Sequence, residues 1–153
     1  MARVTVSKRK EDQWQQKLLE INRVTRVVGG GKRLSFRVVM VIGDFQSKVG
    51  VGVAKAGDVS KAIEKSIFQA QKNIIEVPIV DGAISREVEA KHSSARILIK
   101  PGKKGRGLIA GGPARIILSF AGVKDAVAKN LGRTTNKLTN ATAAIKALKK
   151  LSQ

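Results

Sequence analysis

The clearest hydrophobic pattern in the chain is an alternation of apolar residues along Leu34–Ile42. A period of two residues is typical of a β-strand. A second alternating run spans Val49–Val53, and its opposite face consists of the small residues Gly50, Gly52 and Ala54. We expect this small face to let another backbone approach the strand closely.

Three further segments complete the first half of the chain. A strand is predicted over residues 22–28, ahead of a turn at Gly29–Gly31. Asp58 is a favourable N-cap, and the spacing after it predicts a helix to about Ile75. The residues expected on the buried face of that helix are Ile63, Ile67, Ala70 and Ile74. Trp14 and Leu18 lie four residues apart, which predicts a short helical turn over residues 14–21.

The second half begins with an extended segment at 77–80 and a turn at Asp81–Gly82. Strands are predicted at 84–89 and 95–100, joined near His92. Pro113 suits the first turn of a short helix that Gly122 can end. A strand within 123–131 and a last helix over 138–151 follow.

The predicted fold class is therefore α+β, in two small domains. The predicted division is a flexible basic arm (1–13), a β-β-β-α domain (14–76), a linker (77–83) and a β-β-α-β-α domain (84–153). Two interpretations of the arm stay open: it becomes ordered on RNA, or it is simply disordered.

Charge changes the picture from an ordinary small α+β protein to one with an anionic partner. The chain has 153 residues, a formal net charge of +19 and an isoelectric point near 11.0. Because such a charge repels itself in the compact state, nucleic acid is the expected partner. The absence of cysteine excludes disulfides and thiolate chemistry, and a single histidine, His92, supplies no metal site, so no cofactor is expected. No apolar run reaches the length of a membrane span and the N-terminus has no signal core. We therefore expect no membrane partner, and a protein that works in the compartment where it is made.

The cations concentrate beside flexible glycine backbone. One cluster (Arg23, Arg26, Lys32 and Arg33) surrounds the triple glycine, and a second (Lys103, Lys104 and Arg106) lies in the glycine-rich stretch Gly102–Gly112. Loop cations can reach phosphates, and glycine allows close approach. Aromatic residues make up only 3% of the chain, in no stacking pattern, so a folded RNA read by shape and phosphate position is the better fit.

The second loop also matches a loose dinucleotide pattern, Gly105-x-Gly107-x-x-Ala110, with Asp125 about twenty residues further on. The match is weak, because Gly111, Gly112 and Pro113 delay the helix that should open there. No general base or nucleophile is evident near the loop. A nucleotide-binding enzyme nevertheless stays as an alternative, as does an ordinary glycine-rich connection.

Five segments, in order, resemble bacterial-type small-subunit ribosomal protein five. They are RVTRVVGGGKRLSF (23–36), VGVGVAKAGDV (49–59), ARILIKPGKKGRGLIAGGPARIIL (95–118), AGVKDAVAKNLG (121–132) and NATAAIKAL (140–148). The resemblance implies a double-stranded-RNA-binding-like N-terminal domain, a second α/β domain and no enzymatic activity. It implies binding to small-subunit rRNA near the decoding region, a role in translational accuracy, and a place on the ribosome in a bacterial cytoplasm or a plastid matrix.

The resemblance also assigns candidate residues and partners. It implies contacts with ribosomal proteins four and eight, with protein three as a further candidate, and with mRNA where it enters the subunit; no homo-oligomer is expected. The Arg26 and Gly30–Arg33 region corresponds to the family hairpin near the spectinomycin-binding rRNA. The predicted protein-interface residues are Gly105, Gly107 and Arg115. The predicted rRNA-binding residues are Arg23, Arg26, Gly30, Gly31, Lys32, Arg33, Lys48, Lys55, Lys103, Lys104 and Arg106.

Several positions depart from the family pattern. Gly29 replaces a usual lysine, Phe45-Gln46-Ser47 a common Gly-x-Gly turn, Ala54 a glycine, Gly57 a basic residue, and Ser93-Ser94 a frequent Gly-Ala. These departures bear on individual contacts. A general duplex-RNA binder that acts away from the ribosome is a third possibility.

Overall fold

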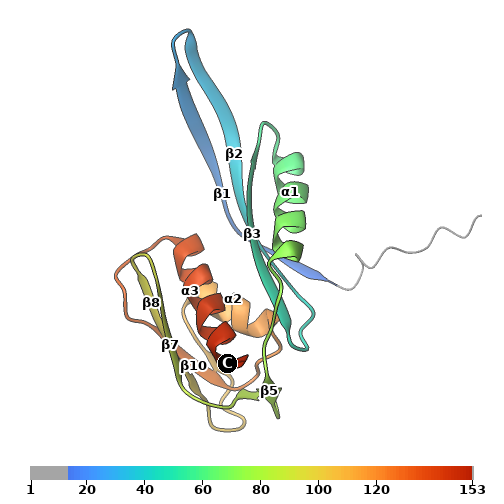
Figure 1. The fold of residues 1–153 in the computed structure, drawn as a ribbon, viewed down its shortest axis with the longest axis vertical. Helices are drawn as coiled ribbons and strands as arrows, with labels where there is room; N and C mark the ends of the chain where they lie inside the picture. The colour runs from blue at the N-terminus through green and yellow to red at the C-terminus, as the bar shows by residue number, and fades with distance from the viewer. Residues whose placement is uncertain (1–13, 153) are drawn as a thin grey trace, which may run out of the picture.

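The computed structural model describes residues 14–152, so the predicted arm lies outside the described residues. The first unit consists of β1 (Gln15–Val28), β2 (Gly31–Gly43), β3 (Lys48–Ala56) and α1 (Val59–Lys72) (Figure 1). Its antiparallel sheet has the order β1-β2-β3-β4, where β4 is the short strand Ile75–Glu76. The predicted β-β-β-α arrangement is confirmed.

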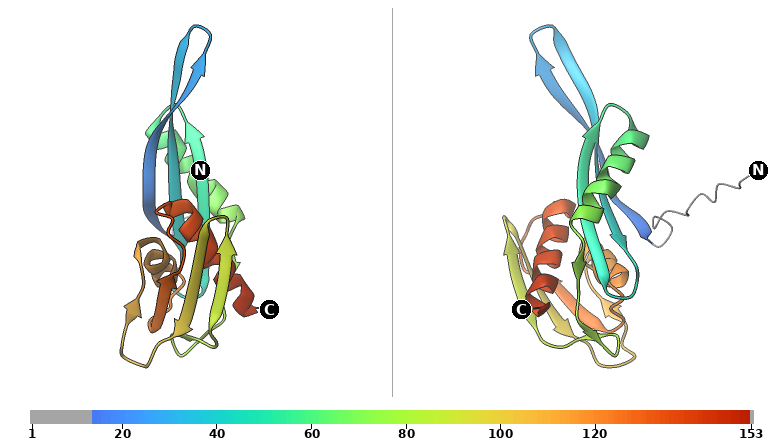
Figure 2. Two further views of the ribbon diagram at one scale, coloured as in Figure 1. Left: turned by 90° about the vertical axis from the view of Figure 1, so that its left-hand side faces the viewer. Right: turned by 45° about the vertical axis from the view of Figure 1, so that its right-hand side comes forward.

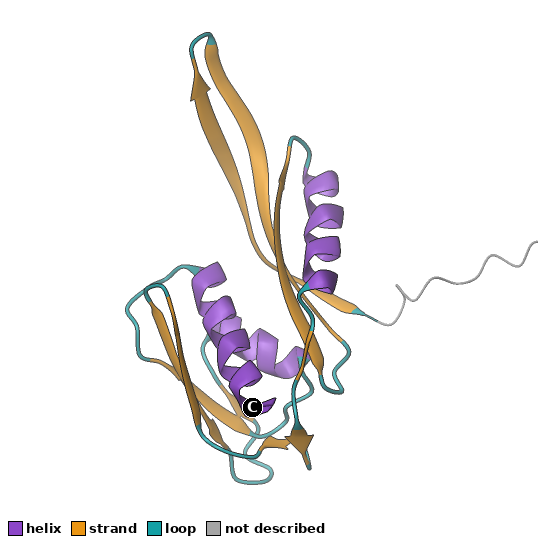
Figure 3. Cartoon of the chain, viewed as in Figure 1, coloured by secondary structure: helices purple, strands orange, loops and turns teal. Residues whose placement is uncertain are grey.

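The second unit follows the β5–β6 hairpin (Ile79–Val80 and Ala83–Ile84). It contains β7 (Val88–His92), β8 (Ala95–Pro101), β9 (Leu108–Ile109), α2 (Gly112–Phe120), β10 (Ala126–Asn130), α3 (Lys137–Lys149) and a 3-10 turn, η2 (Lys150–Ser152) (Figure 3). The sheet order is β7-β8-β10-β9, and β9 pairs in parallel with β10. Apart from the two-residue strand β9, this is the predicted β-β-α-β-α order.

Two predictions of strand and helix position are wrong. Residues 14–21 are not a helical turn: β1 begins at Gln15, because that segment pairs with Val38–Gly43 of β2, with Gln15 opposite Gly43. The strand predicted at 84–89 begins only at Val88, because Ile84 pairs instead with Ile79 in the short hairpin.

Small residues decide how α1 lies on the first sheet. A Cβ on Gly52 would meet the Ser66 carbonyl oxygen at 2.0 Å, and a Cβ on Gly50 would meet the Ala70 carbonyl oxygen at 2.5 Å. The helix therefore buries its own small residues, Ala62, Ser66 and Ala70. The predicted stripe is wrong in this respect, because Ile63 and Ile67 are only partly buried beside the close contact. The expected close approach to this face of β3 is confirmed.

The two units share one hydrophobic core. Its members include Val39, Val41 and Val49 from the first sheet, Ile97 from the second and Ile117 from α2. Helices α2 and α3 lie between the two sheets (Figure 2). Val77, in the predicted linker, is 1% exposed and its N–H donates to the Ser47 carbonyl, so this stretch is packed.

The turn between β2 and β3 forms part of the joint. Phe45 has a φ of 57°, a left-handed conformation that favours glycine. Its ring packs on Phe120 of α2 with centroids 4.9 Å apart. Ser93, one of the positions named above as departing from the family pattern, likewise has a left-handed φ of 52°. No helix within residues 14–152 is both long and apolar enough to cross a membrane.

Candidate nucleic-acid interface

The first cation cluster lies on a two-stranded ribbon that projects from the body of the molecule (Figure 1). β3 pairs with β2 only from Phe36 onward, so the earlier part of β2 is paired with β1 alone. At the tip, a Cβ on Gly29, Gly30 or Gly31 would meet no atom within 4 Å. No internal packing contact therefore requires glycine at these positions, although the φ of 144° at Gly31 favours it there, and the bare backbone is open to an outside partner.

Like charges face each other on this ribbon and at its base, where β3 joins the sheet. Arg26 is directly opposite Arg33, and Arg37 is directly opposite Lys55. Directly opposed like charges destabilise a strand pair. Of the ion pairs among residues 14–152, none involves these four side chains. An external anion is the simplest source of compensation.

The ribbon carries cations on both faces. Because opposed residues share a face, Arg26, Arg33, Arg37 and Lys55 lie on the side of the second unit, whereas Arg23 and Lys32 lie on the side of α1. The sequence analysis missed Arg37. The register between β2 and β3 is the signal that reveals it, since it places Arg37 beside Lys55.

Lys48 is separated from this cluster. It lies at the opposite end of β3, where it faces Glu76 of β4. The adjacent turn is held by Asp44, whose carboxylate accepts hydrogen bonds from the amides of Gln46, Ser47 and Lys48 at 2.9, 3.0 and 2.8 Å. Partial burial raises the pKa of Asp44, but these backbone hydrogen bonds outweigh it and lower the pKa below its ordinary value.

The second glycine-rich loop folds around a carboxylate of its own chain. Asp125 accepts hydrogen bonds from the amides of Gly105 at 3.2 Å and Gly107 at 2.7 Å. Both glycines have positive φ, 79° and 75°, which other residues adopt only with strain. The amides that could bind a phosphate therefore already bind the Asp125 carboxylate. This argues against a nucleotide-binding site in the loop.

The cations of this loop lie on a different part of the surface from the hairpin cations. Lys103, Lys104 and Arg106 are exposed, and the Lys104 ammonium lies 3.7 Å from the Asp81 carboxylate in the β5–β6 turn. That turn lies at the end of the molecule opposite the hairpin tip (Figure 1). Arg115 of α2 donates to the Leu108 carbonyl at 2.9 Å, which holds its guanidinium beside the loop. Apart from Lys48, the predicted site residues thus form two separate surfaces.

Comparison with known proteins agrees with this two-unit organisation. Residues 14–78 match the family model for the N-terminal domain of ribosomal protein S5, and residues 90–153 match the model for its C-terminal domain. The chain belongs to the ribosomal protein S5 family. Members of this family are structural, non-enzymatic constituents of the small ribosomal subunit, and RNA binding and a part in translation follow from membership.

Relatives of the chain come from bacteria and from plastids. The small ribosomal subunit protein uS5c of Rhodomonas salina is 47% identical over 145 residues, which cover 94% of this chain and 86% of the relative. The small ribosomal subunit protein uS5 of Thermotoga neapolitana is 44% identical over 140 residues, which cover 92% and 78%. The expectation of a ribosomal location, bacterial or plastid, is confirmed.

Proposed function

We propose that the β1–β2 hairpin binds small-subunit rRNA near the decoding region. The observation that carries this proposal is the pairing of Arg26 with Arg33 at the end of a projecting ribbon whose glycine tip is open. Arg23 and Lys32 on the other face let the ribbon lie between two phosphate backbones rather than on one. Arg37 and Lys55 extend the same contact toward the body of the protein.

A charge reversal tests this function. The variant Arg26→Glu/Lys32→Glu/Arg33→Glu should fail to enter small subunits, measured as its occupancy in sucrose-gradient fractions of an extract that expresses a tagged copy. The matched control is Lys61→Glu/Lys65→Glu/Lys91→Glu, which reverses the same number of exposed cations outside both clusters. Normal occupancy of the hairpin variant would contradict the proposal.

The same gradient separates the ribosomal role from a general duplex-RNA binder. The unmodified chain should sediment stoichiometrically with the small subunit at low salt and leave it at high salt, because phosphate contacts release counterions. A chain that stays at the top of the gradient at low salt would favour the off-ribosome alternative.

We propose further that the Gly102–Gly112 loop and α2 contact ribosomal protein four. The loop is held in one shape by Asp125, and Arg115 is fixed beside it, so Gly105, Gly107 and Arg115 present a pre-ordered surface. Lys103, Lys104 and Arg106 would contact rRNA at its margin. Arg115→Glu should weaken binding to purified protein four, whereas Lys91→Glu should not; equal binding by both variants would remove this interface.

The remaining contacts are proposed from the family resemblance. The chain contacts ribosomal protein eight, with protein three as a further candidate, and mRNA where it enters the subunit. It also supports translational accuracy. Substitutions in the Asp125-bound loop should change the misreading frequency of a reporter message, and an unchanged frequency would separate the loop from accuracy.

A further inference from the structure

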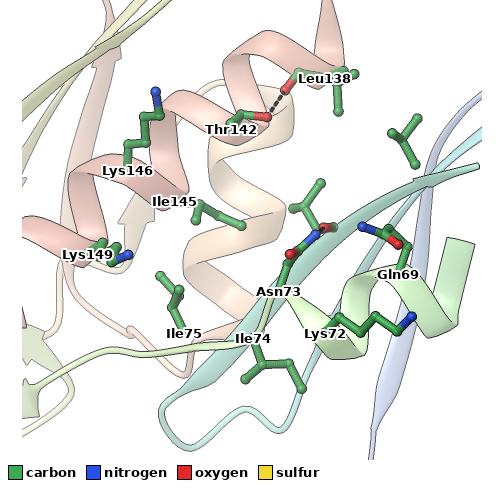
Figure 4. Close-up of a pocket in the computed structure, with 12 residues that line it drawn as sticks. Gln69, Lys72, Asn73, Ile74, Ile75, Leu138, Thr142, Ile145, Lys146 and Lys149 are labelled. Carbon is green, nitrogen blue, oxygen red and sulfur yellow. Dashed lines mark hydrogen bonds between the residues drawn. The ribbon is translucent and has the colours of Figure 1, made fainter.

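A cavity of about 600 Å³ lies between the two units, lined by β3, the end of α1 and α3. Figure 4 shows its two walls: Gln69 and Lys72 come from α1, and Leu138, Ile145, Lys146 and Lys149 come from α3. Neither the hairpin nor the Asp125-bound loop contributes to it. It is a third surface, distinct from the two described above, and we refer to it as the inter-domain groove.

The floor of the inter-domain groove is aliphatic. It contains Val51 and Val53 of β3, Ile75 of β4, and Leu138 and Ile145 of α3. The exposed fraction rises along one face of β3, from 0% at Val49 to 9% at Val51 and 36% at Val53, so the cover over this face thins toward the end of the strand. The shared core therefore opens into the groove, and apolar surface stays uncovered there.

The edge of the groove is positively charged on both sides. Lys72 lies on one wall, and Lys146 and Lys149, three residues apart and so on one side of α3, lie on the other. No acidic residue lines the cavity, and none of the ion pairs among residues 14–152 involves these lysines. A lysine in the last turn of a helix interacts favourably with the negative end of the helix dipole, which explains why lysines occur at these positions. The helix dipole does not explain the aliphatic floor between them.

The composition of the groove differs from that of the hairpin. An apolar depression bordered by polar residues is typical of a protein-binding site. The hairpin carries several arginines, whose planar fork suits phosphate, whereas the cations of the groove are all lysines around an aliphatic floor. From this positively charged edge and aliphatic floor we propose that the inter-domain groove docks a segment of a partner protein with the complementary composition, acidic and apolar. Apolar side chains of the docked segment pack on the aliphatic floor, and its carboxylates pair with Lys72, Lys146 and Lys149.

The test uses the purified full chain and three fluorescent peptides of one leucine-glutamate composition. The first has leucines at helical spacing, the second alternates leucine with glutamate, and the third has all its leucines at one end. Binding is measured by fluorescence anisotropy near physiological salt, where exposed charges are partly screened. One of the two patterned peptides should bind at least about tenfold more tightly than the third. Equal affinity for all three would overturn the proposal, because it would show attraction by net charge alone.

Variants place the contact. Thr142→Trp fills the groove from α3, and it removes only the hydrogen bond from the Thr142 hydroxyl to the Leu138 carbonyl. Thr142→Trp should abolish the tighter binding of the preferred patterned peptide relative to the third peptide. The surface variant Lys72→Glu/Lys146→Glu/Lys149→Glu should do the same. The Lys61→Glu/Lys65→Glu/Lys91→Glu control should retain that preference. A preference that survives both groove variants overturns the proposal.

Duplex RNA decides between the two classes of partner. Binding of an RNA of about 16 base pairs should be insensitive to Thr142→Trp and sensitive to the hairpin variant. If Thr142→Trp weakens RNA binding and the peptides show no preference, the groove belongs to RNA and the proposal is wrong. The hairpin function would stand in that case, so the two proposals fail separately.

Discussion

Gly52→Ala tests the close contact between β3 and α1 on which the first unit depends. The added Cβ would lie 2.0 Å from the Ser66 carbonyl oxygen, 2.4 Å from the Ala70 nitrogen and 2.9 Å from the Ala70 Cα. The carbonyl oxygen would have to retreat to about 3.4 Å before ordinary van der Waals contact begins. All three atoms are backbone atoms of α1, so no side-chain rotation can relieve the clash, and the helix itself must move.

The size of the effect follows from what the movement disrupts. Overpacking of a close-packed interior costs about 1–3 kcal/mol, and a clash with helix backbone belongs at the upper end of that range. For a chain of this length, a loss of about 3 kcal/mol lowers the melting temperature on the order of 10 °C. Thermal unfolding of the full chain, followed by far-ultraviolet circular dichroism, measures the shift.

Gly57→Ala is the matched control. A Cβ on Gly57 would meet no atom within 4 Å, and its backbone lies outside the left-handed region. That variant should therefore keep its stability or gain up to about 1 kcal/mol. Adding Ser66→Ala to Gly52→Ala should not restore stability, because the clash involves the carbonyl and not the hydroxyl. If Gly52→Ala melts within about 2 °C of Gly57→Ala, the reasoning about this contact is refuted.

Three further predictions concern the charged surfaces and turns. The Asp125→Asn variant should release the second loop, seen as faster hydrogen exchange at its amides, since charge-assisted hydrogen bonds are about twice as strong as neutral ones; unchanged exchange would mean that the loop does not depend on the carboxylate. Removing three hairpin cations with Arg26→Ala/Lys32→Ala/Arg33→Ala should reduce the slope of log affinity for rRNA against log salt by about 2.7, and a parallel line would show that they touch no phosphate. Folding lowers the pKa of Asp44, so the ionised carboxylate should make the protein more stable than the Asp44→Asn variant. This difference in stability should be full above the ordinary pKa of 3.8 and should disappear as the pH falls through the lower pKa of the folded state. A difference in stability that is the same at all pH values would contradict this.

The order of elements could be predicted because it depends on local signals. The alternation in Leu34–Ile42 and Val49–Val53 marks two strands of one sheet, β2 and β3. Pro113 lies in the first turn of α2 and Gly122 follows its end, as expected. The errors arose where pairing with a distant segment overrides local spacing. Residues 14–21 have a helical spacing, yet all but Trp14 lie in β1, because β2 is long enough to pair with them.

The candidate site was only partly accessible from the sequence. Clusters of cations beside glycines are visible in the sequence, and Arg26 with Arg33 and Lys103 with Arg106 were found in that way. Arg37 was missed, because its place beside Lys55 depends on the register of β2 and β3. The spacing from the second loop to Asp125 suggested a ribose contact, whereas the carboxylate binds the loop amides of its own chain.

The sequence by itself determined the class of this protein: two α+β units, a strongly basic surface, and the family to which five ordered segments belong. The first two properties follow from composition and local periodicity, and the third from the resemblance of the five segments to a known family; none of them needs knowledge of distant contacts. Only the tertiary structure decided that the two units share one core, that the cation clusters lie at opposite ends, and that an aliphatic groove opens between β3 and α3. Each of these depends on which residues far apart in the chain become neighbours, and no local pattern contains that information.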